Sequence, residues 1–232
     1  IHRIRLNHVH RVDLSNTLGD TLEDTQQYVA VLGHADSYLQ QWHRLLSHAE
    51  QHIYFSVYTW KADHNDIPPH LFIFADGFRN IISRRIASKI TDPPVKVFIL
   101  YNWQHVSSTQ STSMFVTLKY WRACGIDITS NNPHLQIYFL PWRHSFFNNN
   151  HVKFLTVDGQ KTVLFSGNVE SASHGGPGGW RECGLYIEGR VFAKKCQDYY
   201  KQIQTLSKRN AVSAEDMWFS HDTFTQIGRA HV

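Results

Sequence analysis

The stretch that decides the fold consists of two apolar runs joined by a tight turn. Residues 151–158 read His-Val-Lys-Phe-Leu-Thr-Val-Asp, and residues 162–168 read Thr-Val-Leu-Phe-Ser-Gly-Asn. Asp158-Gly159 between them is a strong turn signal. Residues 152–157 and 162–165 are therefore predicted to form a β-hairpin.

This hairpin brings an imidazole and an ammonium group together. Side chains two apart share one face of a strand, which places His151 beside Lys153. The return strand is expected to bring Ser166 and Asn168 to the same end of the sheet. An imidazole nucleophile, a fixed cation and an amide donor suit attack on a phosphodiester, because the cation and the amide offset charge that develops on the phosphoryl oxygens.

The spacing of these residues is specific. A shuffled chain of this composition contains roughly 0.04 copies of His-x-Lys-x4-Asp. The additional spacing of Ser166 and Asn168 makes chance a poor explanation. The alternative interpretation is an ordinary amphipathic hairpin with a solvent-facing His and Lys.

Helical and extended patterns alternate upstream of the hairpin. Helices are predicted from Asp36 as N-cap, from Pro68-Pro69, and over residues 114–123, with Gly125 as the stop of the third helix. Strands are predicted over residues 52–58, 95–100 and 135–140. Downstream, a strand over residues 183–187 and a helix over residues 191–206 are expected. This order predicts an α/β fold with a mixed β-sheet flanked by helices.

The composition of the chain excludes several classes of protein and several kinds of site. The chain has 232 residues, 42% of them hydrophobic, which is enough for a sizeable core. Its formal net charge of +4 suits an anionic substrate and is far from that of a protein that coats nucleic acid. No apolar run reaches the roughly 18 residues of a membrane span. The three cysteines form no Cys-x-x-Cys pair, and His8 and His10 lack a third ligand at metal-site spacing.

The hairpin residues resemble the His-Lys-Asp motif of the phospholipase D superfamily, written His-x-Lys-x4-Asp-x6-Gly-Ser-x-Asn. The residues that match it position by position are His151, Lys153, Asp158, Ser166 and Asn168. Phe165 stands where the family most often has Gly. Residues 180–184, Trp-Arg-Glu-Cys-Gly, with Glu188-Gly189, resemble the downstream Trp-x-Asp/Glu segment of bacterial-type members, including cardiolipin synthase-like proteins. The likeness covers residues 36–207.

The resemblance implies a phospholipase D-like half-domain that works in pairs. Two motifs, from two halves of one chain or from two subunits, are expected to meet at one active site. One His becomes phosphohistidine and the other protonates the leaving alcohol. No metal and no cofactor is implied.

The resemblance also implies individual roles. His151, Lys153 and Asn168 are expected to be catalytic. Glu182 stands where a carboxylate commonly hydrogen-bonds the catalytic imidazole, which would fix the tautomer of the ring. Asp158 is expected to cap the tight turn rather than to touch substrate, and Ser166 is expected to support the site.

The sequence also predicts how the chain is divided. We expect a lead segment over residues 1–35, the half-domain with its single motif over residues 36–207, and over residues 208–226 the start of a linker to a missing second half. Residues 227–232, Ile-Gly-Arg-Ala-His-Val, match the translation of a sequencing adapter and are expected to be foreign to the natural protein.

The predicted function is a phospholipase D-like phosphodiesterase or phosphatidyltransferase that acts on a phospholipid at a membrane surface. An endonuclease of the same superfamily and a degenerate half-domain that only binds are the alternatives. No run of Lys and Arg interleaved with aromatic residues supplies a nucleic-acid track. The intact His151, Lys153 and Asn168 argue against a non-catalytic role. The sequence specifies neither the head group, nor the acceptor, nor the cellular compartment.

Overall fold

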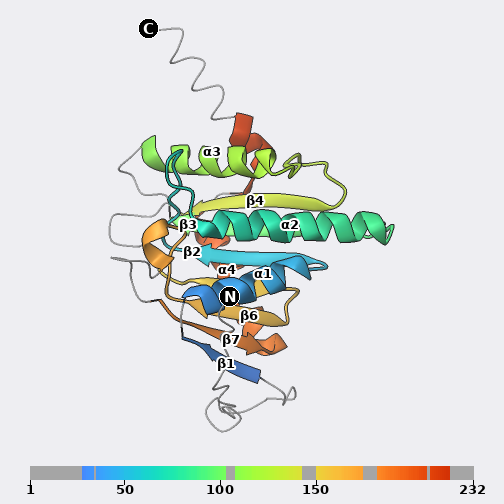
Figure 1. Cartoon of the computed structure of the whole chain (residues 1–232). Helices are drawn as coiled ribbons and strands as arrows, with labels where there is room; N and C mark the ends of the chain where they lie inside the picture. The colour runs from blue at the N-terminus through green and yellow to red at the C-terminus, as the bar shows by residue number, and fades with distance from the viewer. Residues whose placement is uncertain are drawn as a thin grey trace, which may run out of the picture.

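A computed structural model describes residues 28–33, 35–102, 108–142, 150–174, 182–207 and 210–219. Its eight strands form one sheet in the order β1-β7-β6-β5-β2-β3-β4-β8 (Figure 1). The strands are β1 Tyr28–Leu32, β2 His52–Val57, β3 Val95–Asn102, β4 Leu135–Trp142, β5 Phe154–Val157, β6 Lys161–Phe165, β7 Gly184–Glu188 and β8 Val212–Ser213. The helices are α1 Ala35–Ser47, α2 Pro69–Ala87, α3 Ser108–Ala123 and α4 Arg190–Ser207, with a short 3-10 helix η1 at Ser171–His174.

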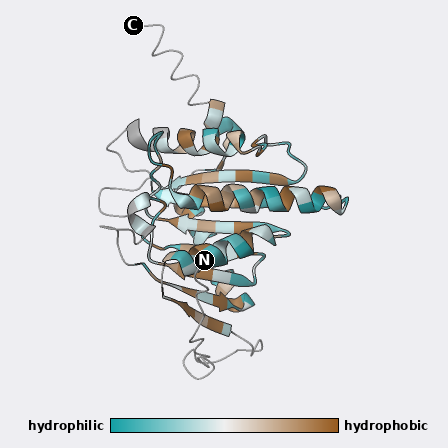
Figure 2. Cartoon of the chain, viewed as in Figure 1, coloured by the Kyte–Doolittle hydropathy of each residue, from teal (hydrophilic) through white to brown (hydrophobic). Residues whose placement is uncertain are grey.

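Helices cover both faces of the sheet, as the sequence predicts. On one face Phe55 of β2 packs against Trp42 of α1 and Phe74 of α2, with ring centroids 5.1 Å apart in both pairs. On the other face Tyr54 of β2 meets Tyr200 of α4 at 5.2 Å. Figure 2 shows apolar and polar residues alternating along α1 and α2, because each helix turns one side to the sheet and one to solvent.

The strand directions bring the ends of several strands to the same edge of the sheet. β2, β3 and β4 run parallel, and β5 runs antiparallel to β2. β6 and β7 then alternate in direction. The carboxyl ends of β2, β3 and β4 therefore lie at the same edge as the start of β5, the end of β6 and the start of β7. We call this the carboxyl edge of the sheet, where open α/β folds bind their ligands.

Helix α1 matches its prediction closely. The apolar residues that recur at helical spacing in this segment are all buried, namely Tyr38, Leu39, Trp42, Leu45, Leu46 and Ala49. The helix begins at Ala35, so Asp36 lies in the first turn and is not the N-cap. Its carboxylate still interacts favourably with the positive end of the helix dipole there.

The closing helix α4 departs from its predicted core. The apolar spacing of this segment predicts five core positions, Val191, Phe192, Tyr199, Ile203 and Leu206. Ile203 is buried and Phe192 and Tyr199 are half-buried, whereas Val191 and Leu206 are 37% and 56% exposed. Cys196 and Tyr200 are buried instead. The helix turns the side that carries Tyr200 towards Tyr54 and Phe98 of the sheet, and apolar residues on its other sides stay in solvent.

The hairpin forms as predicted. Asp158 and Gly159 have φ values of 51° and 65°, as a type I′ turn requires, and Gln160 N donates to Val157 O at 3.1 Å. β5 begins only at Phe154, so His151 and Lys153 precede the strand instead of lying in it.

Two strands come from segments that were expected to flank the half-domain. β1 pairs with β7 at one end of the sheet, and β8 pairs with β4 at the other. Residues 1–27 of the predicted lead segment and residues 220–232, with the predicted adapter tail, lie outside the described residues.

Candidate active site

His151 and Lys153 meet at the carboxyl edge, just before β5. Lys153 Nζ lies 3.1 Å from His151 Nδ1 and donates to His151 O at 3.3 Å. His151 is exposed, whereas Lys153 is only 7% exposed. The nearness of the two groups follows their two-residue spacing, as the sequence predicts.

Asn168 reaches the same edge from the end of β6. Its Oδ1 accepts from Thr59 N at 3.2 Å, and its Nδ2 donates to Glu170 Oε1 at 3.0 Å. These contacts fix the amide plane and leave one of its two N–H groups for another acceptor. The segment that follows β6 is joined to the chain after β2, because Val169 N donates to Thr59 O at 3.1 Å.

Burial and charge act on Lys153 in opposite directions. Burial lowers the pKa of Lys153 below its ordinary value, because a desolvated ammonium group is less stable. The nearby carboxylates of Glu182 and Glu170 raise it. The result is a poorly solvated cation that two carboxylates support at the edge of the sheet.

Glu182 makes a different contact from the one that the resemblance implies. Its carboxylate accepts a hydrogen bond from Ser166 Oγ, and within the described part of the chain it makes none with His151. Ser166 also accepts from Cys183 N at 2.9 Å, so it joins the end of β6 to the start of β7. The imidazole Nδ1 contacts Lys153 instead. Trp180 and Arg181, beside Glu182, lie outside the described residues.

Asp158 lies at the other end of the hairpin. Its carboxylate accepts from the backbone N–H groups of Glu50, Gln51 and His52 at 2.9, 2.8 and 3.0 Å. The span from His151 to Asp158 is on the order of 20 Å along an extended chain. The carboxylate therefore ties the hairpin turn to the start of β2, whereas the expected role was a cap within the turn.

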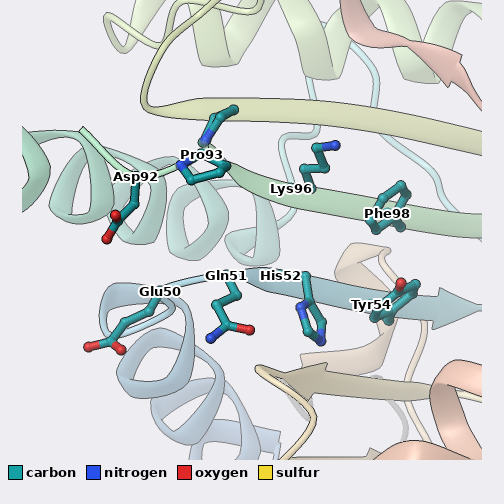
Figure 3. Close-up of a pocket in the computed structure, with 9 residues that line it drawn as sticks. Glu50, Gln51, His52, Tyr54, Asp92, Pro93, Lys96 and Phe98 are labelled. Carbon is teal, nitrogen blue, oxygen red and sulfur yellow. The ribbon is translucent and has the colours of Figure 1, made fainter. Parts of the chain in front are cut away.

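The segment that Asp158 holds also borders a pocket of about 560 Å³ (Figure 3). Tyr54 and Phe98, stacked at 4.9 Å, line it together with Lys96 and the side chains of Glu50 and Asp92. It opens at the amino ends of β2 and β3. The pocket is thus separate from the His151 and Lys153 pair at the carboxyl edge.

Sequence reasoning missed a buried polar network that holds the backbone beside His151. Asn150 N donates to Asn102 Oδ1 at 3.0 Å, and Asn102 Nδ2 donates back to Asn150 O at 2.7 Å. Asn150 Nδ2 donates to Ser56 Oγ, and Tyr199 OH donates to Asn150 Oδ1 at 2.8 Å. Ser56 Oγ in turn donates to Val152 O at 2.7 Å. No spacing rule connects these residues, which come from β2, β3, the hairpin and α4.

Two further side chains at this edge were also missed. Glu170, 6% exposed, bonds Asn168 and pairs with Lys61 Nζ at 3.1 Å. Its position two residues after Asn168 is a signal that could have identified it. Tyr58 follows β2, and its ring lies 4.5 Å from the ring of His151.

Among the described residues, His, Cys, Asp and Glu side chains nowhere gather in a group of three that could hold a metal ion. His8 and His10 lie outside those residues. None of the helices described combines the length and apolar character that a bilayer crossing requires.

Comparisons with known proteins place the fold. No model of a protein family matches the sequence, and no curated protein matches it. Nuc from Salmonella typhimurium, a phospholipase D family member, aligns over 81% of this chain and 98% of its own, with 13% identity and a TM-score of 0.51. NucT from Helicobacter pylori aligns over 81% and 98%, with 15% identity and a TM-score of 0.47. Phosphatidylserine synthase from Haemophilus influenzae aligns over 88% and 46%, with 15% identity and a TM-score of 0.46.

The likeness to Nuc extends over nearly the whole of that chain. It agrees with the mixed sheet and the two helical layers described above. We conclude that this protein has the phospholipase D fold.

Proposed function

We propose that this protein is a phospholipase D-type phosphodiesterase or phosphatidyltransferase that acts on a phospholipid through a phosphohistidine at His151. The observation that carries the proposal is the 3.1 Å contact between His151 Nδ1 and Lys153 Nζ at the carboxyl edge. The phospholipase D fold supports the same class of reaction.

In the first step Nε2 of His151 attacks phosphorus. The N–P bond forms and the P–O bond to the leaving alcohol breaks. Lys153 moves from Nδ1 to a non-bridging oxygen, where its charge offsets the charge that develops there, and the second N–H of Asn168 does the same. In the structure the Lys153 ammonium donates to Nδ1, so the ring proton lies on Nε2. This proton must pass to Nδ1 when Lys153 leaves it, before Nε2 attacks. In the second step water or an alcohol attacks phosphorus and Nε2 leaves.

The leaving alkoxide needs a proton that His151 does not supply. An acid on the opposite side of phosphorus must stay protonated while His151 is neutral, which calls for a second group in a different environment. We propose that the histidine of a second motif supplies this proton. It belongs to a second copy of this chain or to a second half of a longer one.

The experiment compares His151→Asn with His48→Asn. His48 is an exposed histidine of the α1–β2 connection, so it serves as the matched control. Each protein is incubated with phospholipid vesicles, with bis(p-nitrophenyl) phosphate and with single-stranded DNA, and acid-labile phosphoenzyme is trapped. His151→Asn should lose turnover and phosphoenzyme, and His48→Asn should retain both. Near-normal turnover by His151→Asn would refute the nucleophile, and turnover of DNA alone would favour an endonuclease.

A further inference from the structure

Tyr58 places one aromatic ring against both basic groups of the motif. It follows Val57, the last residue of β2, and therefore lies at the carboxyl edge. Its ring centroid is 4.5 Å from that of His151, with 34° between the ring planes. Lys153 Nζ lies 5.8 Å from the same centroid. The tyrosine is half-buried, unlike Phe55 and Trp60 on either side of it, which are fully buried.

Two contacts within the described part of the chain orient the His151 side chain. The buried network around Asn150 fixes the backbone on both sides of the residue. The exposed imidazole itself contacts Lys153 through Nδ1 and Tyr58 through its face. These two contacts occupy Nδ1 and one face of the ring, so Nε2 is the nitrogen on the side of the ring away from Lys153.

The reaction proposed above changes the charge of this ring. When Nε2 bonds to phosphorus and Nδ1 carries the ring proton, the ring becomes a cation. The electron-rich face of a tyrosine attracts a cation within about 6 Å of its centroid. The Tyr58 ring meets that condition in the free protein.

We propose that Tyr58 is a positioning residue that holds the His151 imidazole with Nε2 towards the substrate and stabilises the positive charge of the phosphorylated ring. This inference rests on the proposed function. It assigns the positioning and the charge stabilisation to the aromatic ring and not to the phenolic hydroxyl. A phenylalanine at position 58 should therefore function as well as the tyrosine.

The kinetic experiment uses the full chain with Tyr58→Leu, Tyr58→Phe and Tyr138→Leu. Tyr138 is the matched control, because it is a half-buried tyrosine of the same sheet that stacks on Phe98 at 5.4 Å, away from His151. Tyr58→Leu should lower kcat for bis(p-nitrophenyl) phosphate by roughly 3- to 10-fold with KM unchanged. Tyr58→Phe and Tyr138→Leu should keep the kcat of the unmodified chain. Full activity of Tyr58→Leu, or equal losses in the Leu and Phe variants, would overturn the proposal.

An NMR experiment tests the ring contact without relying on activity. The ring current of Tyr58 should shift the carbon-bound protons of the His151 imidazole, which are assigned with the His151→Asn variant. Those shifts should persist in Tyr58→Phe and disappear in Tyr58→Leu. Shifts that are unchanged in Tyr58→Leu would overturn the positioning role. A dimer that shows the expected shifts but has no turnover would keep the ring contact and reject the proposed function.

Discussion

Lys153 is a cation in a place that water reaches poorly. It is 7% exposed, and burial lowers its pKa while Glu182 and Glu170 act against that shift. A charge in such surroundings interacts with a neighbouring phosphoryl oxygen more strongly than a charge in water does. The burial of this residue therefore suits the role that we propose for it.

Replacement of Lys153 by Met should separate chemistry from stability. The variant keeps the buried stem and loses the charge, so kcat should fall by roughly 10²- to 10³-fold, as for the loss of one preorganised donor. Tm should change little. The control is Lys161→Met at the far end of the hairpin, whose ammonium is exposed and pairs with Glu188 at 3.8 Å. A large loss of Tm with little change in kcat would make Lys153 a structural residue.

Replacement of Asp158 should lower stability and leave kcat unchanged, which is the opposite of the result expected for Lys153. Asp158→Ala removes the acceptor of three backbone N–H groups at the start of β2. Unfolding in urea should show a loss of about 1–3 kcal/mol, and kcat per folded molecule should stay the same. Asp92→Ala, an exposed carboxylate at the same end of the sheet, is the control. A fall in kcat with unchanged stability would place Asp158 in the chemistry.

His52 should make stability depend on pH. Burial lowers the pKa of His52, with a smaller contribution from Lys201, while Asp158 raises it. The pKa of His52 in the folded protein therefore lies below the value of about 6.5 in the unfolded chain. Between these two pKa values the unfolded state binds more protons than the folded state, so stability should fall as the pH drops below about 6.5. Urea unfolding between pH 8 and pH 5 should show a smaller loss for His52→Gln than for the unmodified chain. Equal losses would contradict the assignment.

At the scale of elements, strand β6 ends in a large aromatic residue that packs under helix α1. Phe165 is 7% exposed and stands where glycine is usual. Its ring packs 4.4 Å from Trp42 and 5.6 Å from Phe55, beneath α1. The residue fills the core between helix and sheet, so its size has a packing role.

Phe165→Ala should therefore destabilise the protein strongly. The loss of a buried aromatic ring and the resulting cavity cost about 3–5 kcal/mol in the free energy of unfolding. Phe72→Ala serves as the control, because Phe72 is 55% exposed on α2. Chemical denaturation of both variants gives the comparison. A small effect at Phe165 would show that α1 closes over the gap.

At the scale of the whole molecule, the sequence contains a single His-x-Lys-x4-Asp pattern. The described edge brings together His151, Lys153 and Asn168, and the proposed two-step reaction needs a second imidazole across the phosphorus. The alignment with Nuc covers 98% of that chain, so this chain includes a whole fold unit of that kind.

Activity should therefore depend on association. Residues 1–226 are purified, the oligomeric state is recorded, and hydrolysis of phospholipid and of bis(p-nitrophenyl) phosphate is measured over a range of protein concentrations. A monomer should be essentially inactive, because it lacks the acid, and an active dimer would indicate that two copies share the site. A monomer with robust turnover would contradict the two-motif requirement.

The features that can be predicted from the sequence are those that depend on residues close together in the chain. The turn at Asp158-Gly159, the contact of His151 with Lys153 and the buried side of α1 all follow from residues a few positions apart. Strand and helix periodicity express the geometry of the backbone, which is local. The mixed sheet between helices follows from the order of these elements.

The distant residues around His151 and Lys153 become neighbours through the folding of the whole sheet. Tyr58 and Asn102 come from two other strands and reach His151 and its neighbour because β2 and β3 end at the same edge as the hairpin. The partner of Glu182 is Ser166 because β6 and β7 pair in register there. Register and helix rotation result from packing the whole core, and a one-residue change would turn each of these side chains to the other face.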